Sequence, residues 1–270
     1  MKVTIVVDNI EHAGIPGEWG FCAYIEQNGK KLLLDTGASN LFADNAEKLN
    51  IDLKDVDFAI LSHAHYDHAN GMGKFFEINE KAPFYLQEGC GENCYFKKGF
   101  IRKYIGIPKG ITKKYQDRIE YVSGVYTVAD GIYLVSHSTP HLEQIGKKEM
   151  MYQKTKLGWK PDNFCHEQSL VLDTDGGLVI FNSCSHGGVV NIINEVKAAF
   201  PNKKITALIG GFHIFNHPEE EIRELAKLIK ETGIQRIYTG HCSKERGYRI
   251  LREELGDMAG QFYVGMELEF

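Results

Sequence analysis

The chain has 270 residues, of which 43% are hydrophobic and 25% charged, and its formal net charge is −5. These values are ordinary for a soluble globular protein near the upper size for one hydrophobic core, so we expect a single domain over residues 1–270. No run of about 18 apolar residues occurs, so no membrane span is expected. The negative net charge disfavours bulk affinity for nucleic acid.

The compartment is predicted from the cysteines and the N-terminal residues. The six cysteines are scattered along a chain too long to need a disulfide framework, so we expect free thiols and a cytoplasmic protein. Cys90 and Cys94 form a C-x3-C pair without a second pair at zinc-binding spacing, and we interpret them as unrelated thiols. Residues 1–12 lack a long apolar stretch and indicate a first strand, not a signal peptide.

The first third of the chain alternates short β-rich runs with turns. We expect strands at 3–7, 21–26 and 31–34, the last two joined by a hairpin turn at 27–30. Residues 57–62 form a short apolar run typical of a buried strand, and this run ends directly at a group of histidines.

Residues 87–118 lack clear periodicity, and they are basic and aromatic. From residue 95 to residue 118 the chain has eight basic residues and one acidic residue, and a second segment, 147–160, has five basic residues and one acidic residue. The rest of the chain is therefore strongly acidic, and the asymmetry predicts a local positive field. We expect residues 87–118 to be an insertion or lid over a site. The alternative is a solvent-exposed surface segment with no role at the site.

The second half is β-rich first and then alternates strands with helices. β-Rich runs at 121–136 and 169–182 precede a strand at 205–209. Pro218 and three glutamates open a helix that ends before Gly233. A strand at 236–239 and a helix at 244–255 close the pattern. Two mixed sheets covered by helices on their outer faces would bury it, so the fold class is α/β.

The motif His63-Ala-His65-Tyr-Asp67-His68 is the strongest functional pattern in the chain. Imidazole nitrogen and carboxylate oxygen are ligands that zinc and similar divalent metals favour. Four donors within six residues are too many for a single open catalytic metal that also draws ligands from elsewhere. The motif therefore predicts two adjacent metal ions.

Together with further segments, this motif resembles the metallo-β-lactamase superfamily. The other matching segments are 33–37 (LLDTG), 181–188 (FNSCSHGG), 209–213 (IGGFH) and 239–242 (TGHC). The set is similar to a narrower branch, the proteins like the methanopterin-pathway dihydropterin ribofuranosyl-aminobenzene phosphate synthase. The resemblance implies an αβ/βα sandwich of two mixed sheets flanked by helices, with the metals at one edge.

The resemblance also implies a ligand set and a pair of divalent metal ions, zinc first, with manganese or iron as alternatives. It assigns His63 and His65 to the first metal, and Asp67, His68 and His241 to the second. These are expectations for a dinuclear site.

The chain departs from the usual superfamily pattern after the strand that ends near residue 182. Cys184 stands where a bridging aspartate is usual, and it is either a thiolate ligand or a buried thiol that binds nothing. We expect His186 as the third ligand of the first metal, with His137 and His141 as rival sources of that imidazole. Asp35 is expected to support the histidine loop and not to bind metal.

The expected chemistry is hydrolysis by a metal-activated water. Asp67 would both bind metal and orient that water, and His213 would contact the substrate or transition state unless its role is structural. Lys97, Lys98 and Arg102, with aromatic residues between them, predict a small anionic substrate carrying a flat ring.

Three functions are compatible with these residues. The first is a hydrolase acting on a small anionic ester, phosphoester or lactone. The second is a biosynthetic enzyme that joins a dihydropterin to an aminobenzene ribose phosphate, and the third, less favoured, is a nuclease. His12, His166 and His217 are expected at surface or turn positions, and the oligomeric state is left open.

Overall fold

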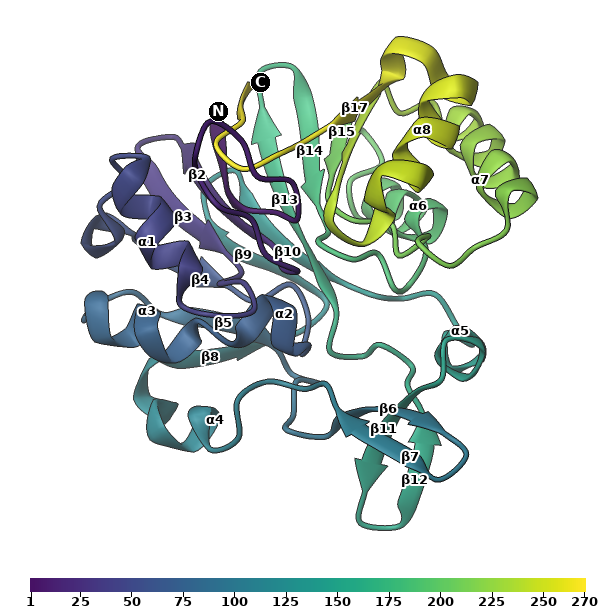
Figure 1. Cartoon of the computed structure of the whole chain (residues 1–270). Coiled ribbons are helices and arrows are strands. Elements are labelled where there is room, and N and C mark those ends of the chain that lie inside the picture. The colour runs from purple at the N-terminus through teal and green to yellow at the C-terminus, as the bar shows by residue number, and fades with distance from the viewer.

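Two seven-stranded sheets pack face to face in the computed structural model, which describes residues 1–270 (Figure 1). In order across the sheet, the strands of the first are β18 (Glu267–Glu269), β1 (Lys2–Val7), β2 (Cys22–Gln27), β3 (Lys30–Leu34), β4 (Phe58–Ile60), β5 (Phe84–Gln87) and β8 (Ile119–Val122). Those of the second are β17 (Ala259–Gln261), β16 (Arg236–Thr239), β15 (Ile205–Ile209), β14 (Gly177–Phe181), β13 (Gln168–Thr174), β10 (Ile132–Ser136) and β9 (Val125–Ala129).

Helices cover the outer face of each sheet (Figure 1). On the first sheet lie α1 (Leu41–Lys48), α2 (Tyr66–Ala69), α3 (Met72–Ile78) and α4 (Ile111–Lys114). On the second lie α6 (Val189–Ala199), α7 (Glu219–Glu231) and α8 (Lys244–Leu255), while α5 (Glu143–Lys148) lies beside a third, smaller sheet. Short 3-10 turns occupy Leu53–Asp55, Gln116–Arg118, His241–Ser243 and Gly256–Met258. No helix is both long enough and apolar enough to cross a bilayer.

The strand residues alternate between two apolar cores. In β3, Leu32 and Leu34 belong to the core between the sheets, and Leu33 belongs to the core under the first helical layer. In β14, Val179 and Phe181 face the core between the sheets, and their neighbours in that strand face the second helical layer. Burial on both faces explains why residues 32–34 of β3 and 178–181 of β14 are all apolar. The predicted αβ/βα sandwich is confirmed.

Helix α7 shows how local sequence sets an element. Pro218 stands at its N-cap, acidic residues fill the first turn, and Ile222, Ala226 and Ile229 form its buried stripe. Gly233 follows the helix with a φ of +73°, which a glycine adopts without steric cost. The helix expected after Pro218 is therefore present.

A third sheet of four strands projects from the sandwich (Figure 1). Its order is β12 (Gly158–Pro161), β11 (Met151–Thr155), β6 (Cys94–Lys98) and β7 (Ile101–Tyr104). The segment 87–118, for which no regular period was expected, thus contains β6 and β7, which pair with each other, and β6 also pairs with β11 of the second basic segment. A β-bridge between His65 and Gly106 joins this projecting sheet to the histidine motif.

Candidate metal centre

The residues of the candidate site follow the carboxyl ends of parallel strands. In the first sheet β3 and β4 run parallel and lead to Asp35 and the histidine motif. In the second sheet β14, β15 and β16 run parallel and lead to His186, His213 and His241. Ligands of open α/β sheets characteristically bind at this end of the strands, and here both sheets present that end to one cavity.

Asp35 holds the histidine loop through three hydrogen bonds. Its carboxylate accepts from the backbone N of Ser62, from Ser62 Oγ and from His68 Nδ1, each at 2.7 Å. Ser62 Oγ in turn lies 2.9 Å from His63 Nδ1. Because the carboxylate only accepts, both histidines carry their proton on Nδ1 and have Nε2 free. Supporting groups of this kind orient the histidine ligands of metal sites, and Asp35 lies where the sequence placed such a residue.

The first group of candidate metal ligands consists of His63, His65 and His186. All three are buried, and their ring nitrogens lie within 4.8 Å of one another. His65 Nδ1 is 3.1 Å from His186 Nε2, and His63 Nε2 is buried without a hydrogen-bond partner. A buried polar nitrogen left without a partner is costly, and a divalent metal at this point would satisfy it.

The second group consists of Asp67, His68 and His241. Asp67 Oδ2 lies 3.5 Å from His241 Nε2 and 3.9 Å from His68 Nε2. His241 Nδ1 faces Asn9 Oδ1 at 3.2 Å, which leaves its Nε2 buried and unpaired. The nitrogens that point inward from His68 and His241 are thus again the Nε2 atoms.

The electrostatics of the two groups suit a cation. Burial, followed by neighbouring imidazoles, holds the pKa of His63 and His186 well below the ordinary value, and burial lowers that of His65 to about 3. These rings are therefore neutral, as metal binding requires. Burial alone would raise the pKa of Asp67, but His68 and His241 lower it, so this carboxyl is ionised.

Two cysteines lie beside the second group. Cys184 Sγ is 3.2 Å from His68 Nε2. Cys242 Sγ is 3.5 Å from Cys184 Sγ. Cys184 was a candidate ligand from the sequence, whereas no sequence pattern indicated a role for Cys242, because only the fold brings the ends of β14 and β16 together.

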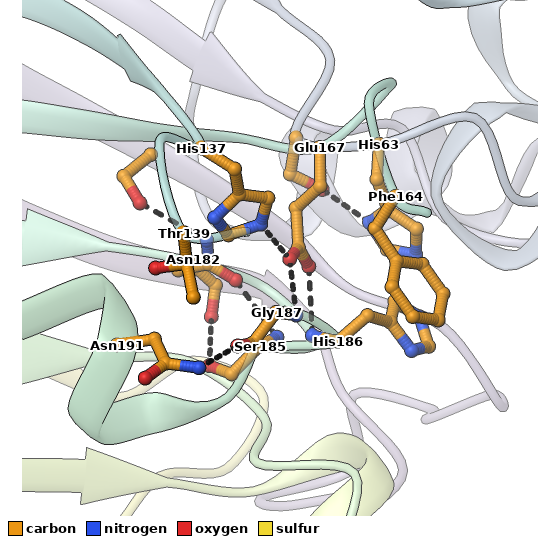
Figure 2. A network of polar contacts seen from close by, with 12 residues as sticks. His63, His137, Thr139, Phe164, Glu167, Asn182, Ser185, His186, Gly187 and Asn191 are labelled. Atoms are coloured by element: carbon orange, nitrogen blue, oxygen red, sulfur yellow. Dashed lines mark hydrogen bonds and ion pairs between the residues drawn. The ribbon is translucent and has the colours of Figure 1, made fainter. Parts of the chain in front are cut away.

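His137 and His141 do not reach the metal groups. Both ring nitrogens of His137 are held by carboxylates, Nε2 by Glu167 at 2.5 Å and Nδ1 by Glu195 at 2.8 Å. His141 is exposed. Glu167 also accepts from the backbone N of His186 at 2.9 Å, so this network positions the very residue that His137 was expected to rival (Figure 2).

His166 is fully buried, and its expected surface or turn position was wrong. Its Nδ1 accepts a hydrogen bond from the backbone N of Ala64 at 3.2 Å, and its Nε2 faces Asp162 Oδ2 at 3.1 Å. The Asp162–His166 pair therefore supports the backbone of the histidine motif at Ala64. No spacing in the sequence could have found it, since Asp162 and His166 follow the projecting sheet and meet the motif only in the fold.

A cavity of about 420 Å³ opens over both groups. Its wall includes His213, whose ring centroid lies 4.4 Å from that of His186, and several aromatic and apolar side chains. The aromatic and apolar residues are Trp19, Tyr66, Phe96, Ile105, Met151 and Phe215.

Lys103 is the lysine that lines this cavity, and the expected Lys97, Lys98 and Arg102 do not line it. For Lys97 and Arg102 the strand register gives the reason, whereas Lys98 is on the face of Phe96 but lies exposed at the end of β6. Phe96 pairs with Lys103 on one face of the projecting sheet, and Lys97 pairs with Arg102 on the other. There Lys97 lies over the ring of Tyr152 and Arg102 over that of Trp159.

Comparisons with known proteins agree with this architecture. The model of the metallo-β-lactamase superfamily matches residues 19–146. A Methanocaldococcus jannaschii protein, 7,8-dihydropterin-6-methyl-4-(β-D-ribofuranosyl)-aminobenzene-5'-phosphate synthase, is 29% identical over 93% of this chain and 88% of its own. The crystal structure of a metal-dependent hydrolase of the β-lactamase superfamily has a TM-score of 0.85 at 26% identity, covering 100% of this chain and 99% of that one. Zn(2+)-bound PqqB from Methylobacterium extorquens shares the fold, with a TM-score of 0.58 at 12% identity over 100% of both chains.

Proposed function

Because residues 19–146 match the model of the metallo-β-lactamase superfamily, we propose that the chain is a metal-dependent hydrolase with two adjacent metal positions, acting on a small anionic ester, phosphoester or lactone. The observation that carries the proposal is a cluster of buried imidazoles in which His63, His65, His186 and His241 each have one ring nitrogen without a hydrogen-bond partner, while Ser62, Asp35 and Asn9 hold the Nδ1 atoms of His63, His68 and His241. This donor set fits two divalent ions, with zinc first among them.

The residues proposed as ligands fall into two groups. His63, His65 and His186 would hold the first ion, and Asp67, His68 and His241 the second. When bound, two such ions supply Lewis acidity and a water molecule that is deprotonated near neutral pH. The chain itself supplies the ionised carboxylate of Asp67, which can orient that water.

His213 is proposed to donate a proton to the leaving group or to stabilise the charge that develops. Its Nδ1 is buried and unpaired, and its ring lies in the cavity wall. Burial alone would lower the pKa of His213, but Cys242 and Glu149 raise it above the ordinary value. A protonated imidazole at this point can act as a general acid.

The cavity walls support an anionic substrate that carries a flat ring. Trp19 and Phe215 stand with ring centroids 5.8 Å apart, and Lys244 Nζ lies 5.2 Å from each ring. Lys103 Nζ lies 5.8 Å from the ring of Tyr66. Aromatic faces stack on planar heterocycles, and the Lys103 ammonium in the cavity wall would pair with phosphate or carboxylate.

A second candidate function is biosynthetic coupling of a dihydropterin to an aminobenzene ribose phosphate. The observation that favours it is the similarity, at 29% identity over 93% of the chain, to a protein named as that synthase. In this function the same metal centre would act without consuming water.

Metal content and turnover test the two functions together. Elemental analysis should find about two divalent ions per wild-type chain, a loss in His186→Ala, and no change in the matched control His141→Ala, which alters an exposed histidine. Hydrolysis of one class in a panel of phosphoesters, lactones and carboxylic esters would support the first proposal. Bound metal with no hydrolysis, together with product from the two biosynthetic precursors, would overturn it in favour of the second. Absence of bound metal would overturn both.

A further inference from the structure

Cys184 and Cys242 meet across the end of a strand that separates them. Cys184 follows β14 and Cys242 follows β16, and β15 lies between these strands in the sheet. Their sulfur atoms are nevertheless only 3.5 Å apart. Both side chains are buried, and both line the cavity of the candidate metal centre.

Two glycines at the end of β15 make this approach possible. A Cβ atom at Gly211 would lie 2.4 Å from Cys242 Sγ and 2.7 Å from the carbonyl oxygen of Ser183. A Cβ at Gly210 would lie 1.8 Å from the carbonyl oxygen of Asn182. Any side chain at either position would collide with the loops that carry the two cysteines. The glycine pair therefore keeps open the space in which the thiols meet.

The thiol pair faces the second group of candidate metal ligands. Cys184 Sγ lies 3.2 Å from His68 Nε2, the nitrogen that Asp35 leaves free. Ligand atoms of Cys184, Cys242 and His241 lie within 4.8 Å of one another. The backbone N of His213 donates to Cys242 Sγ at 3.2 Å, so this sulfur already serves as an acceptor.

We propose that Cys184 and Cys242 form a dithiol that binds the ion of the second metal position through both sulfur atoms. The inference rests on the proposed function, which requires a metal there, and extends it to the kind of ion. On binding, each S–H bond is exchanged for an S–metal bond and each proton leaves to solvent. Soft thiolates favour zinc and other thiophilic ions over manganese or magnesium, which prefer oxygen ligands.

X-ray absorption of the zinc-loaded chain, kept reduced and free of oxygen, tests the proposal without relying on activity. The wild type should show sulfur scatterers at about 2.3 Å from zinc. Cys184→Ser and Cys242→Ser should each lose one of the two sulfurs, and the double variant should lose both. Cys165→Ser, a cysteine away from the cavity, is the matched control and should keep the wild-type spectrum.

The outcomes separate this inference from the proposed function. Zinc bound in a shell of nitrogen and oxygen alone would overturn the dithiol and leave the metal-dependent function standing. Sulfur lost in Cys184→Ser but retained in full in Cys242→Ser would also overturn it. No metal bound to the wild type would overturn both. If a serine variant fails to fold, the absorption spectrum of the cobalt-loaded wild type tests the proposal without variants. A spectrum without sulfur-to-cobalt charge-transfer absorption would contradict the proposal.

Discussion

The role of each histidine depends on the hydrogen-bond partners of its two ring nitrogens. His63, His68 and His241 each have Nδ1 held by a neighbouring side chain; Nε2 is unpaired in His63 and His241, and in His68 it faces Cys184 Sγ. His137 has both nitrogens held by carboxylates. Burial alone would lower the pKa of His137, but Glu167 and Glu195 raise it from 6.5 to about 10. His137 is therefore an imidazolium that ties three segments of the chain together.

The raised pKa of His137 predicts a pH-dependent contribution to stability. Because the folded value of about 10 exceeds the ordinary 6.5, the stabilisation is full below pH 6.5 and is lost as the pH rises toward 10. His137→Gln should lower the free energy of unfolding by about 3 kcal/mol near pH 6 and by clearly less near pH 10. Urea denaturation of both proteins at the two pH values measures this. An equal difference in the free energy of unfolding at both pH values would contradict the assignment of a positive charge to His137.

Asp35 supports both metal positions, whereas Ser62 relays that support to His63. Asp35→Ala should therefore weaken zinc at both positions by about 10- to 100-fold. Ser62→Ala should weaken mainly the first position, since His68 keeps its bond to Asp35. Competition titrations with a zinc chelator measure both affinities. Equal losses at both positions in Ser62→Ala would contradict this division.

At the scale of elements, strand register decides which cations can meet a substrate. The β6–β7 hairpin puts Lys103 on the cavity face and turns Lys97 and Arg102 to the opposite face. A shift of one residue would exchange these sets. The composition of the segment predicted a basic wall but could not predict which lysine faces the cavity.

The register predicts an asymmetric result from alanine variants. Lys103→Ala should raise KM for an anionic substrate about tenfold, because one charge-assisted hydrogen bond is lost. Lys97→Ala and Arg102→Ala serve as matched controls of equal charge change and should leave KM near the wild-type value. Steady-state kinetics on the substrate identified from the panel checks this. A larger effect from Lys97 or Arg102 would place the substrate on the other face.

How far the sequence predicted each element depended on how local its pattern was. The strand at 205–209 and the helix at 244–255 were expected at the bounds that the structure has. The helices at 41–48, 72–78 and 189–199 were not predicted, because no cap or period marked them clearly. The histidine motif is contiguous and was found, whereas the pairing of Asp162 with His166 and of Cys184 with Cys242 depends on segments far apart in the chain.

At the scale of the whole molecule, the two sheets meet at the metal centre. The first sheet leads to His63, His65, Asp67 and His68, and the second leads to His186 and His241. Each proposed ion would therefore take ligands from both halves of the sandwich. This is why the proposed metals bear on stability as well as on chemistry.

Removal of metal should accordingly lower thermal stability. A metal ion whose free concentration is about 100 times its dissociation constant stabilises the folded chain by about 2.7 kcal/mol. For a chain of this length, chelation should lower the Tm by roughly 5–10 °C. Differential scanning calorimetry with and without chelator measures the shift, and added zinc should restore it. An unchanged Tm would indicate that the ligands do not bind metal jointly.

The projecting sheet is fastened to the body at two separate places. Gly106 bridges to His65 on one side, and on the other Glu149, just before β11, has Oε2 at 3.8 Å from His213 Nε2. The projecting sheet therefore contacts both halves of the sandwich, one through His65 and the other through His213. Whether the segment 87–118 moves as a lid stays a prediction, and these two contacts are the ones such a movement would break. Phe96, Lys103 and Met151 of this sheet line the cavity, so a substrate bound over the candidate metal ligands would touch the projecting sheet as well as both halves of the sandwich.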